Sequence, residues 1–182
     1  GNSGPNLLVG SGAANVLRGG GGNDTLDGEP GNDTLVGGLG DDLYVLNVPT
    51  DVVDETADGG AGTDTVWLNF AATGTYTLPV PVENGTVVAA PGVAVHITGN
   101  AQANVLVGHA GNNSLAGGLG HDSFTGSLGN DTVVGGDGIE EPALRLQIQA
   151  GIDMHCRLVG IESQRLRLGL GCASRIALLA QR

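Results

Sequence analysis

The sequence predicts an all-β chain built from short, repeated strands. Between Gly19 and Val45 the chain divides every nine residues into GGGGNDTLD, GEPGNDTLV and GGLGDDLYV. Position 8 of each nonad is apolar, and in TLD it lies between two polar residues, which is typical of a very short strand with one inward side chain. The 182 residues include 34 glycines and only 3% aromatic residues, so the predicted core is thin.

The turns of these nonads carry the residues that predict a metal site. Glycine at positions 1, 2 and 4 is expected to adopt positive φ in a tight turn and to expose backbone carbonyls. Position 6 adds the carboxylate of Asp24, Asp33 or Asp42. Ca²⁺ prefers about six to eight oxygen ligands of these two kinds. The glycines of this predicted site are Gly19, Gly20, Gly22, Gly28, Gly31, Gly37, Gly38 and Gly40.

The repeat resembles the G-G-x-G-x-D-x-U-x nonapeptide of the RTX family, the haemolysin-type calcium-binding proteins. The resemblance implies a right-handed parallel β-roll, a form of β-solenoid, in which two nonapeptides make one turn. It also implies that each ion lies between a loop and the loop two repeats further on. Asp24 would then pair with Asp42, and Asp33 with Asn15, whose amide offers a neutral oxygen.

A second series of nonads starts at Gly99 with GNAQANVLV, GHAGNNSLA, GGLGHDSFT and GSLGNDTVV. The same pairing rule joins Asp131 to Asn113 and Asp122 to Glu140. We expect calcium binding here to be weaker than at Asp24 and Asp42. The glycines at the ligand positions of this block are Gly117, Gly118, Gly120 and Gly129.

Four regions follow from this pattern: a first β-roll block at 1–45, a β-rich spacer at 46–98, a second roll block at 99–138, and an atypical basic tail at 139–182. The spacer resembles segments between roll blocks of large bacterial RTX proteins, through its YxV, D-x-V-x-E, GTDTV, YTL and VEN motifs. Gly85 interrupts the apolar run expected after VEN. The roll is expected to end near Gly138, and the tail is interpreted as a β-cap, a frameshift product or a secretion signal.

Some spacer residues allow more than one interpretation. The acidic residues Asp51, Asp54, Glu55, Asp58 and Asp64 could hold a second metal ion, but we expect an acidic, solvated edge that discourages sheet aggregation. Trp67 and Phe70 are expected to fill the core of the spacer rather than to bind a sugar.

Composition and motifs exclude several functions. A net charge of −12 and the absence of lysine argue against nucleic acid or an anionic membrane as partner. No apolar run approaches the roughly 18 residues of a membrane span. The chain has no H-E-x-x-H, G-x-S-x-G or G-x-x-x-x-G-K-[ST] motif, so we predict no enzymatic activity.

The predicted function is a calcium-binding β-roll module of a secreted bacterial RTX protein, folding on Ca²⁺ after export. The resemblance implies a type I secretion machinery as export partner; no other protein partner is predicted. Because Gly1 is already in register, we expect a piece of a longer protein. Two alternatives remain: the C-terminal accessory domain of a secreted metalloprotease, lipase or epimerase, or a segment of a surface adhesin.

Overall fold

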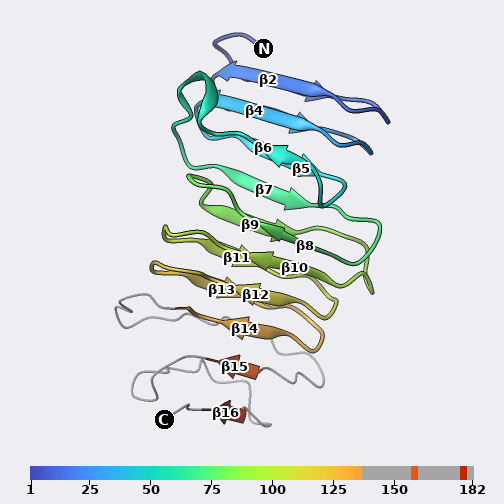
Figure 1. Ribbon diagram of the computed structural model, residues 1–182, viewed down its shortest axis with the longest axis vertical. Helices are drawn as coiled ribbons and strands as arrows, with labels where there is room; N and C mark the ends of the chain where they lie inside the picture. The colour runs from blue at the N-terminus through green and yellow to red at the C-terminus, as the bar shows by residue number, and fades with distance from the viewer. Residues whose placement is uncertain (137–156, 160–176, 180–182) are drawn as a thin grey trace.

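The chain folds as a stack of parallel strands, in which each turn of backbone lies on the turn before it (Figure 1). The computed structural model describes residues 1–136, 157–159 and 177–179. Every pair of named strands within these residues is parallel. The predicted all-β parallel roll is confirmed.

From the first named strand to β14 (Thr132–Val134), successive strands alternate between two walls. The first wall is one seven-stranded sheet. Its strands are β1 (Leu7–Val9), β3 (Thr25–Asp27), β5 (Leu43–Leu46), β7 (Thr65–Leu68), β9 (Asn84–Val87), β11 (Val105–Val107) and β13 (Ser123–Thr125). The second wall consists of two sheets. They contain β2 (Val16–Gly21), β4 (Thr34–Leu39) and β6 (Val52–Val53), and then β8 (Gly74–Thr77), β10 (Val95–Thr98), β12 (Ser114–Ala116), β14 (Thr132–Val134), β15 (Arg157–Val159) and β16 (Ala177–Leu179).

The length of a turn differs between the repeats and the spacer. In the first block Leu8 pairs with Leu26 and Leu26 with Tyr44, so one turn spans two nonapeptides, as the resemblance implies. In the spacer the steps lengthen, and Tyr44 pairs with Val66, which in turn pairs with Gly85. The spacer therefore continues the first wall without interruption, whereas the second wall is divided between β6 and β8.

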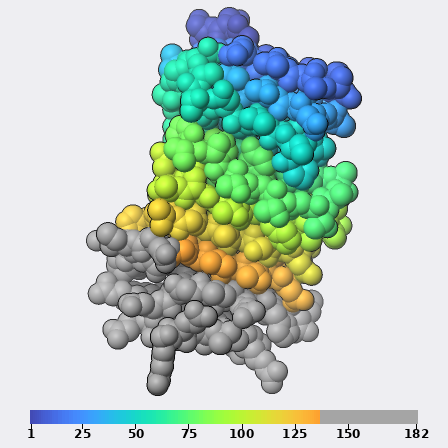
Figure 2. Space-filling model, viewed as in Figure 1, coloured from blue at the N-terminus to red at the C-terminus, as the bar shows by residue number. Residues whose placement is uncertain are grey.

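The core is a row of inward side chains between the walls, two from each turn of the repeat blocks and three or more from each turn of the spacer. Leu26, Leu35 and Tyr44 are 0% exposed, and Leu106, Leu115 and Phe124 are buried in the same cluster further along. Burying one such side chain contributes roughly 1.5 to 3 kcal/mol. The space-filling view shows the colours following one another in bands along the column, as expected where a turn contacts the turns next to it (Figure 2).

The spacer core accommodates Gly85 and buries one of the two aromatic residues predicted to fill it. Gly85 leaves no gap, because a Cβ there would lie 3.3 Å from methyl groups of Ile97 and Leu78, which fill the space instead. Phe70 is buried as predicted, but the prediction that Trp67 fills the core was wrong. Its indole is 41% exposed, because strand alternation turns its neighbours Val66 and Leu68 inward.

Parallel pairing extends beyond Gly138, where the sequence predicted the roll to end. The strand β14 pairs with β15, and β15 with β16. Most of the region 139–182 lies outside the described residues, including Glu140, the expected partner of Asp122. No helix in the described part of the chain is long and apolar enough to cross a membrane.

Candidate metal centre

A series of acidic and amide side chains occupies the turns that precede the strands, and we call it the acid ladder. In each step a side-chain oxygen accepts a hydrogen bond from the backbone N–H of its counterpart one turn earlier. Asp42 Oδ1 accepts from Asp24 N at 2.7 Å, and Asp33 Oδ1 accepts from Asn15 N at 2.8 Å. In the second block, Asp131 Oδ1 accepts from Asn113 N and Asp122 Oδ1 from Asn104 N, both at 2.9 Å.

The ladder continues into the spacer, which the sequence did not predict. Asp64 Oδ1 accepts from Asp42 N at 2.8 Å, and Glu83 Oε2 accepts from Asp64 N at 2.8 Å. On the other wall Asp51 Oδ1 accepts from Asp33 N at 3.1 Å. One signal was visible: GTDTV at residues 62–66 repeats the pattern of GNDTL at 31–35. The 22-residue step from Asp42 to Asp64 concealed it, because the repeat predicts 18 residues.

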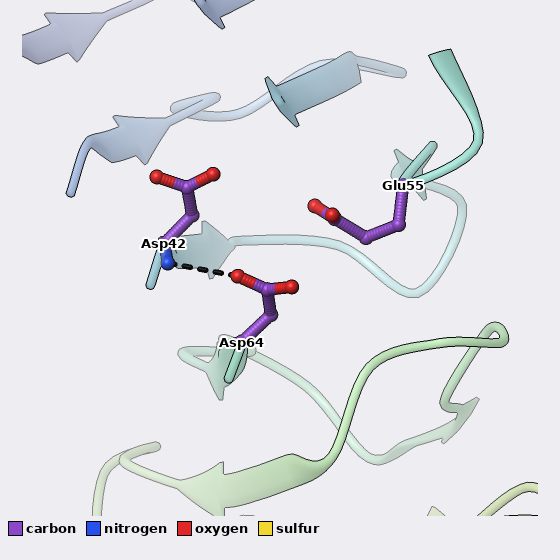
Figure 3. Close-up of side chains that lie close together, drawn as sticks. All are labelled: Asp42, Glu55 and Asp64. Carbon is purple, nitrogen blue, oxygen red and sulfur yellow. Dashed lines mark hydrogen bonds between the residues drawn. The ribbon is translucent and has the colours of Figure 1, made fainter. Parts of the chain in front are cut away.

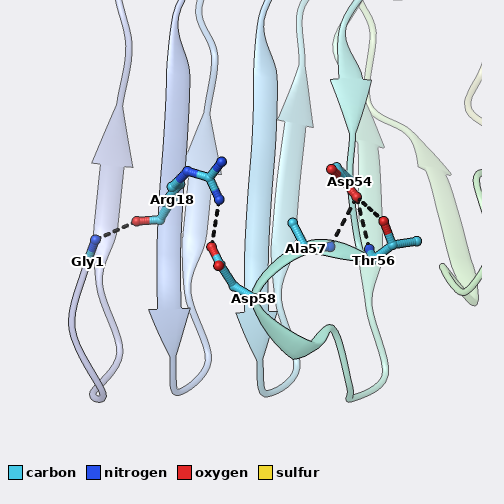
Figure 4. A network of polar contacts seen from close by, with 6 residues as sticks. All are labelled: Gly1, Arg18, Asp54, Thr56, Ala57 and Asp58. Atoms are coloured by element: carbon cyan, nitrogen blue, oxygen red, sulfur yellow. Dashed lines mark hydrogen bonds and ion pairs between the residues drawn. The ribbon is translucent and has the colours of Figure 1, made fainter.

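The expectation of a solvated acidic edge in the spacer was wrong for three of its residues. Asp51, Glu55 and Asp64 are at most 3% exposed. Asp54 and Asp58 do lie at the surface, where Asp58 forms an ion pair with Arg18 at 2.7 Å (Figure 4). Around β6 the division follows strand alternation, which turns Asp51 and Glu55 to the buried side and Asp54 to the other side, whereas Asp58 lies in a 3₁₀ turn.

The ladder leaves one oxygen of several carboxylates without a partner. The Oδ2 atoms of Asp24, Asp33, Asp42 and Asp64 are buried and accept no hydrogen bond. Leaving a charged oxygen in this state costs several kcal/mol unless an opposite charge compensates it. These atoms are therefore available as ligands for a cation.

The glycines at position 1 allow these oxygens to approach the backbone. A Cβ added at Gly37 would overlap Asp42 Oδ2, and one at Gly19 would overlap Asp24 Oδ2 and lie 2.7 Å from the carbonyl oxygen of Gly37. Both glycines lie outside the left-handed region, so the expectation of positive φ was wrong for position 1. It holds at position 2, where Gly20 and Gly38 have φ of 108° and 105°.

Carboxylate and carbonyl oxygens thus converge beside the position 1 glycines. These are the two kinds of ligand that Ca²⁺ prefers in proteins, and the site offers no thiolate that would favour a softer metal. The residues present fit a calcium ion.

Burial also changes the acidity of these groups. It raises the pKa of Asp42 to about 6, with smaller contributions from the negative charges of Asp64 and Asp24. Burial raises the pKa of Asp51, Asp64 and Asp131 in the same direction. For Glu55, burial and the neighbouring charge of Asp64 raise the pKa to about 8. Protons therefore compete with a cation for these oxygens near neutral pH.

Comparison with known families decides the relationship of the chain. The model of the RTX calcium-binding nonapeptide repeat matches four times, over residues 1–35, 9–44, 96–124 and 107–139. The chain carries RTX-type calcium-binding repeats in both of its repeat blocks. Comparison with curated proteins and with solved structures finds no match. The ladder residues Asp51, Asp64 and Glu83 of this RTX-repeat chain lie outside the matched repeats.

Proposed function

We propose that this RTX-repeat chain is a calcium-binding β-roll module of a secreted bacterial protein, and that it folds when it binds Ca²⁺ outside the cell. The observation that carries the proposal is the step from Asp24 to Asp42. There, two buried carboxylates lie in consecutive turns and each keeps an unpartnered Oδ2.

The residues that would hold calcium are the ladder carboxylates together with backbone carbonyls of the glycine turns. Asp24, Asp42 and Asp33 would serve the first block, with Asn15 as a neutral neighbour. Asp122, Asp131 and Asn113 would serve the second block. When bound, the ion supplies positive charge between turns, which offsets the repulsion between stacked carboxylates.

Calcium binding of this kind would make folding depend on the calcium concentration around the chain. Extracellular calcium modules bind with Kd of roughly 10⁻⁴ to 10⁻³ M, so a chain of this kind stays unfolded where calcium is scarce. Where calcium exceeds the Kd a hundredfold, each site adds about 2.7 kcal/mol to the stability of the fold. Export before folding, through a type I machinery, fits this order of events.

Far-UV circular dichroism during a calcium titration tests the proposal, with magnesium as the control cation. We expect a disordered spectrum in chelator that becomes β-rich with calcium and not with magnesium. The double variant Asp24→Asn, Asp42→Asn should need more calcium for the same change. Identical spectra in chelator and in calcium would refute calcium-driven folding.

A further inference from the structure

Asp42, Glu55 and Asp64 form a compact group of carboxylates where the first repeat block meets the spacer (Figure 3). Asp42 precedes β5, and Asp64 precedes β7 one turn later. Glu55 comes from the segment between β6 and the 3₁₀ turn η1 (Ala57–Gly59). One oxygen from each side chain lies within 4.8 Å of the other two, and all three residues are buried.

Glu55 distinguishes this group from the steps of the acid ladder. It is 2% exposed, it is not part of a nonapeptide, and neither of its carboxylate oxygens has a hydrogen-bond partner. The Oδ2 atoms of Asp42 and Asp64 are likewise buried without a partner. Figure 3 shows the Glu55 side chain extending from its own segment toward the space beside the two aspartates.

The spacing of the oxygens fits one shared cation. Two oxygens that each lie roughly 2.3 to 2.6 Å from the same Ca²⁺ are at most about 5 Å apart, and these three groups meet that limit. Three buried carboxylates without a counter-charge repel one another strongly in a medium of low dielectric constant. Arg18, the one arginine among residues 1–136, pairs at the surface with Asp58.

The segment that carries Glu55 is fixed to the roll on both sides. On one side Asp54 N donates to the carbonyl oxygen of Leu35 in β4 at 2.9 Å, while its Oδ1 accepts local hydrogen bonds from Thr56 Oγ1 at 2.7 Å and Thr56 N at 3.0 Å (Figure 4). Further on, Ala61 accepts a hydrogen bond from Gly40 N at 2.7 Å. A Cβ at Gly60 would overlap the Glu55 carbonyl oxygen, so only glycine permits this close return of the chain. In the folded chain Glu55 is thus held in place by the backbone of its own segment.

We propose that Asp42, Glu55 and Asp64 bind one Ca²⁺ ion at a site that the nonapeptide pattern does not describe. The ion would connect the last repeat of the first block to the spacer, so that the spacer folds together with that block. This inference rests on the proposed calcium-binding function. It adds a ligand, Glu55, whose removal leaves the Asp24, Asp33 and Asp131 ladder steps unchanged.

The test is a count of bound calcium ions by equilibrium dialysis, with affinities from calorimetry, for the Glu55→Gln variant. The matched control is Glu29→Gln, the same chemical change at an exposed glutamate. We expect Glu55→Gln to lose one ion, or to bind one ion at least tenfold more weakly, while Glu29→Gln equals the wild type. If both variants bind the same number of ions with the same affinities, the site is overturned although the proposed function stands. If the wild type binds no calcium, both fail.

If Glu55→Gln does not fold, a second measurement tests the proposed site in the wild type. Trp67 is the only tryptophan, and it lies three residues after Asp64, about 10 Å along an extended strand. Tb³⁺ added to the wild type and excited through Trp67 should therefore emit, and Ca²⁺ should displace the emission. Absence of such emission would overturn the site.

Discussion

The carboxylate of Asp42 accepts a hydrogen bond from the backbone N–H of Asp24 at 2.7 Å, and its own N–H donates to Asp64 at 2.8 Å. Asp42 therefore joins three consecutive turns, and it belongs both to the acid ladder and to the group with Glu55. No other described residue is both a predicted ligand of the first block and a member of that group.

Replacing Asp42 by asparagine should separate its charge from its hydrogen bond. The amide oxygen of Asp42→Asn can still accept from Asp24 N, but it no longer contributes a charge to a cation. We expect the calcium midpoint of folding to rise, and stability in a hundredfold excess of calcium to fall by about 2.7 kcal/mol for each site lost. Chemical denaturation at fixed calcium measures this. Asp41→Asn, at the exposed neighbouring residue, is the control, and an equal effect of both variants would contradict the prediction.

Calcium affinity should increase with pH. The raised pKa values of Asp42, about 6, and Glu55, about 8, mean that protons occupy these groups in the metal-free folded chain up to near neutral pH. Ligands must lose these protons, so affinity should rise between roughly pH 5 and 8 and binding should release protons. Calorimetry in two buffers of different ionisation enthalpy measures the release. Affinity that does not change over this range would argue against these carboxylates as ligands.

In the absence of metal, pH should have the opposite effect: the stability of the fold should fall as pH rises. A carboxyl group whose pKa is higher in the folded state than in the unfolded chain stabilises the fold while it is protonated. That stability is fully present below the unfolded pKa and is lost as pH rises through the folded pKa. In chelator we therefore expect more β-structure at pH 4 than at pH 8. Circular dichroism at the two pH values, repeated for Glu55→Gln, should show a smaller difference in the variant.

Substituting the position 1 glycine should destabilise the first block and weaken its calcium binding. In Gly37→Ala the new Cβ would overlap Asp42 Oδ2 and the Tyr44 hydroxyl, so the turn must shift. Overpacking of this kind typically costs about 1 to 3 kcal/mol. Gly12→Ala is the control, because the nearest atom to its Cβ would be 3.8 Å away. Thermal melting in calcium compares the two, and equal melting temperatures would show that position 1 tolerates a side chain.

The free energy of unfolding should depend much more on Phe124 than on Trp67. Phe124 is 1% exposed, so Phe124→Ala should lower the free energy of unfolding by about 3 to 5 kcal/mol. Trp67 is 41% exposed, and we expect Trp67→Ala to cost much less. Denaturation in saturating calcium tests the pair. The reverse order would mean that Trp67 is buried, as the sequence first suggested.

In the repeat blocks, where the same residue types recur every nine residues, the local sequence was sufficient to predict burial and pairing. The position 8 residues Leu26 and Leu35 are buried as the nonapeptide predicts, and the Asp24 and Asp42 pair is one turn apart as the resemblance implies. In these blocks each turn repeats the one before, so the position of a residue in its nonad fixes its position in the stack.

The spacer could not be derived in this way. Its steps from Asp42 to Asp64, from Asp64 to Glu83 and on to Asn104 span 22, 19 and 21 residues, and no periodicity predicts them. The burial of Glu55 could not be predicted either, because its acidic neighbours in the sequence indicate a solvated edge. The sequence by itself determined the repeat, its short strands and its predicted calcium ligands. Only the tertiary structure decided how the spacer pairs and which carboxylates it buries, because hydrogen bonding to the preceding turn, and not local pattern, sets the path of an irregular segment.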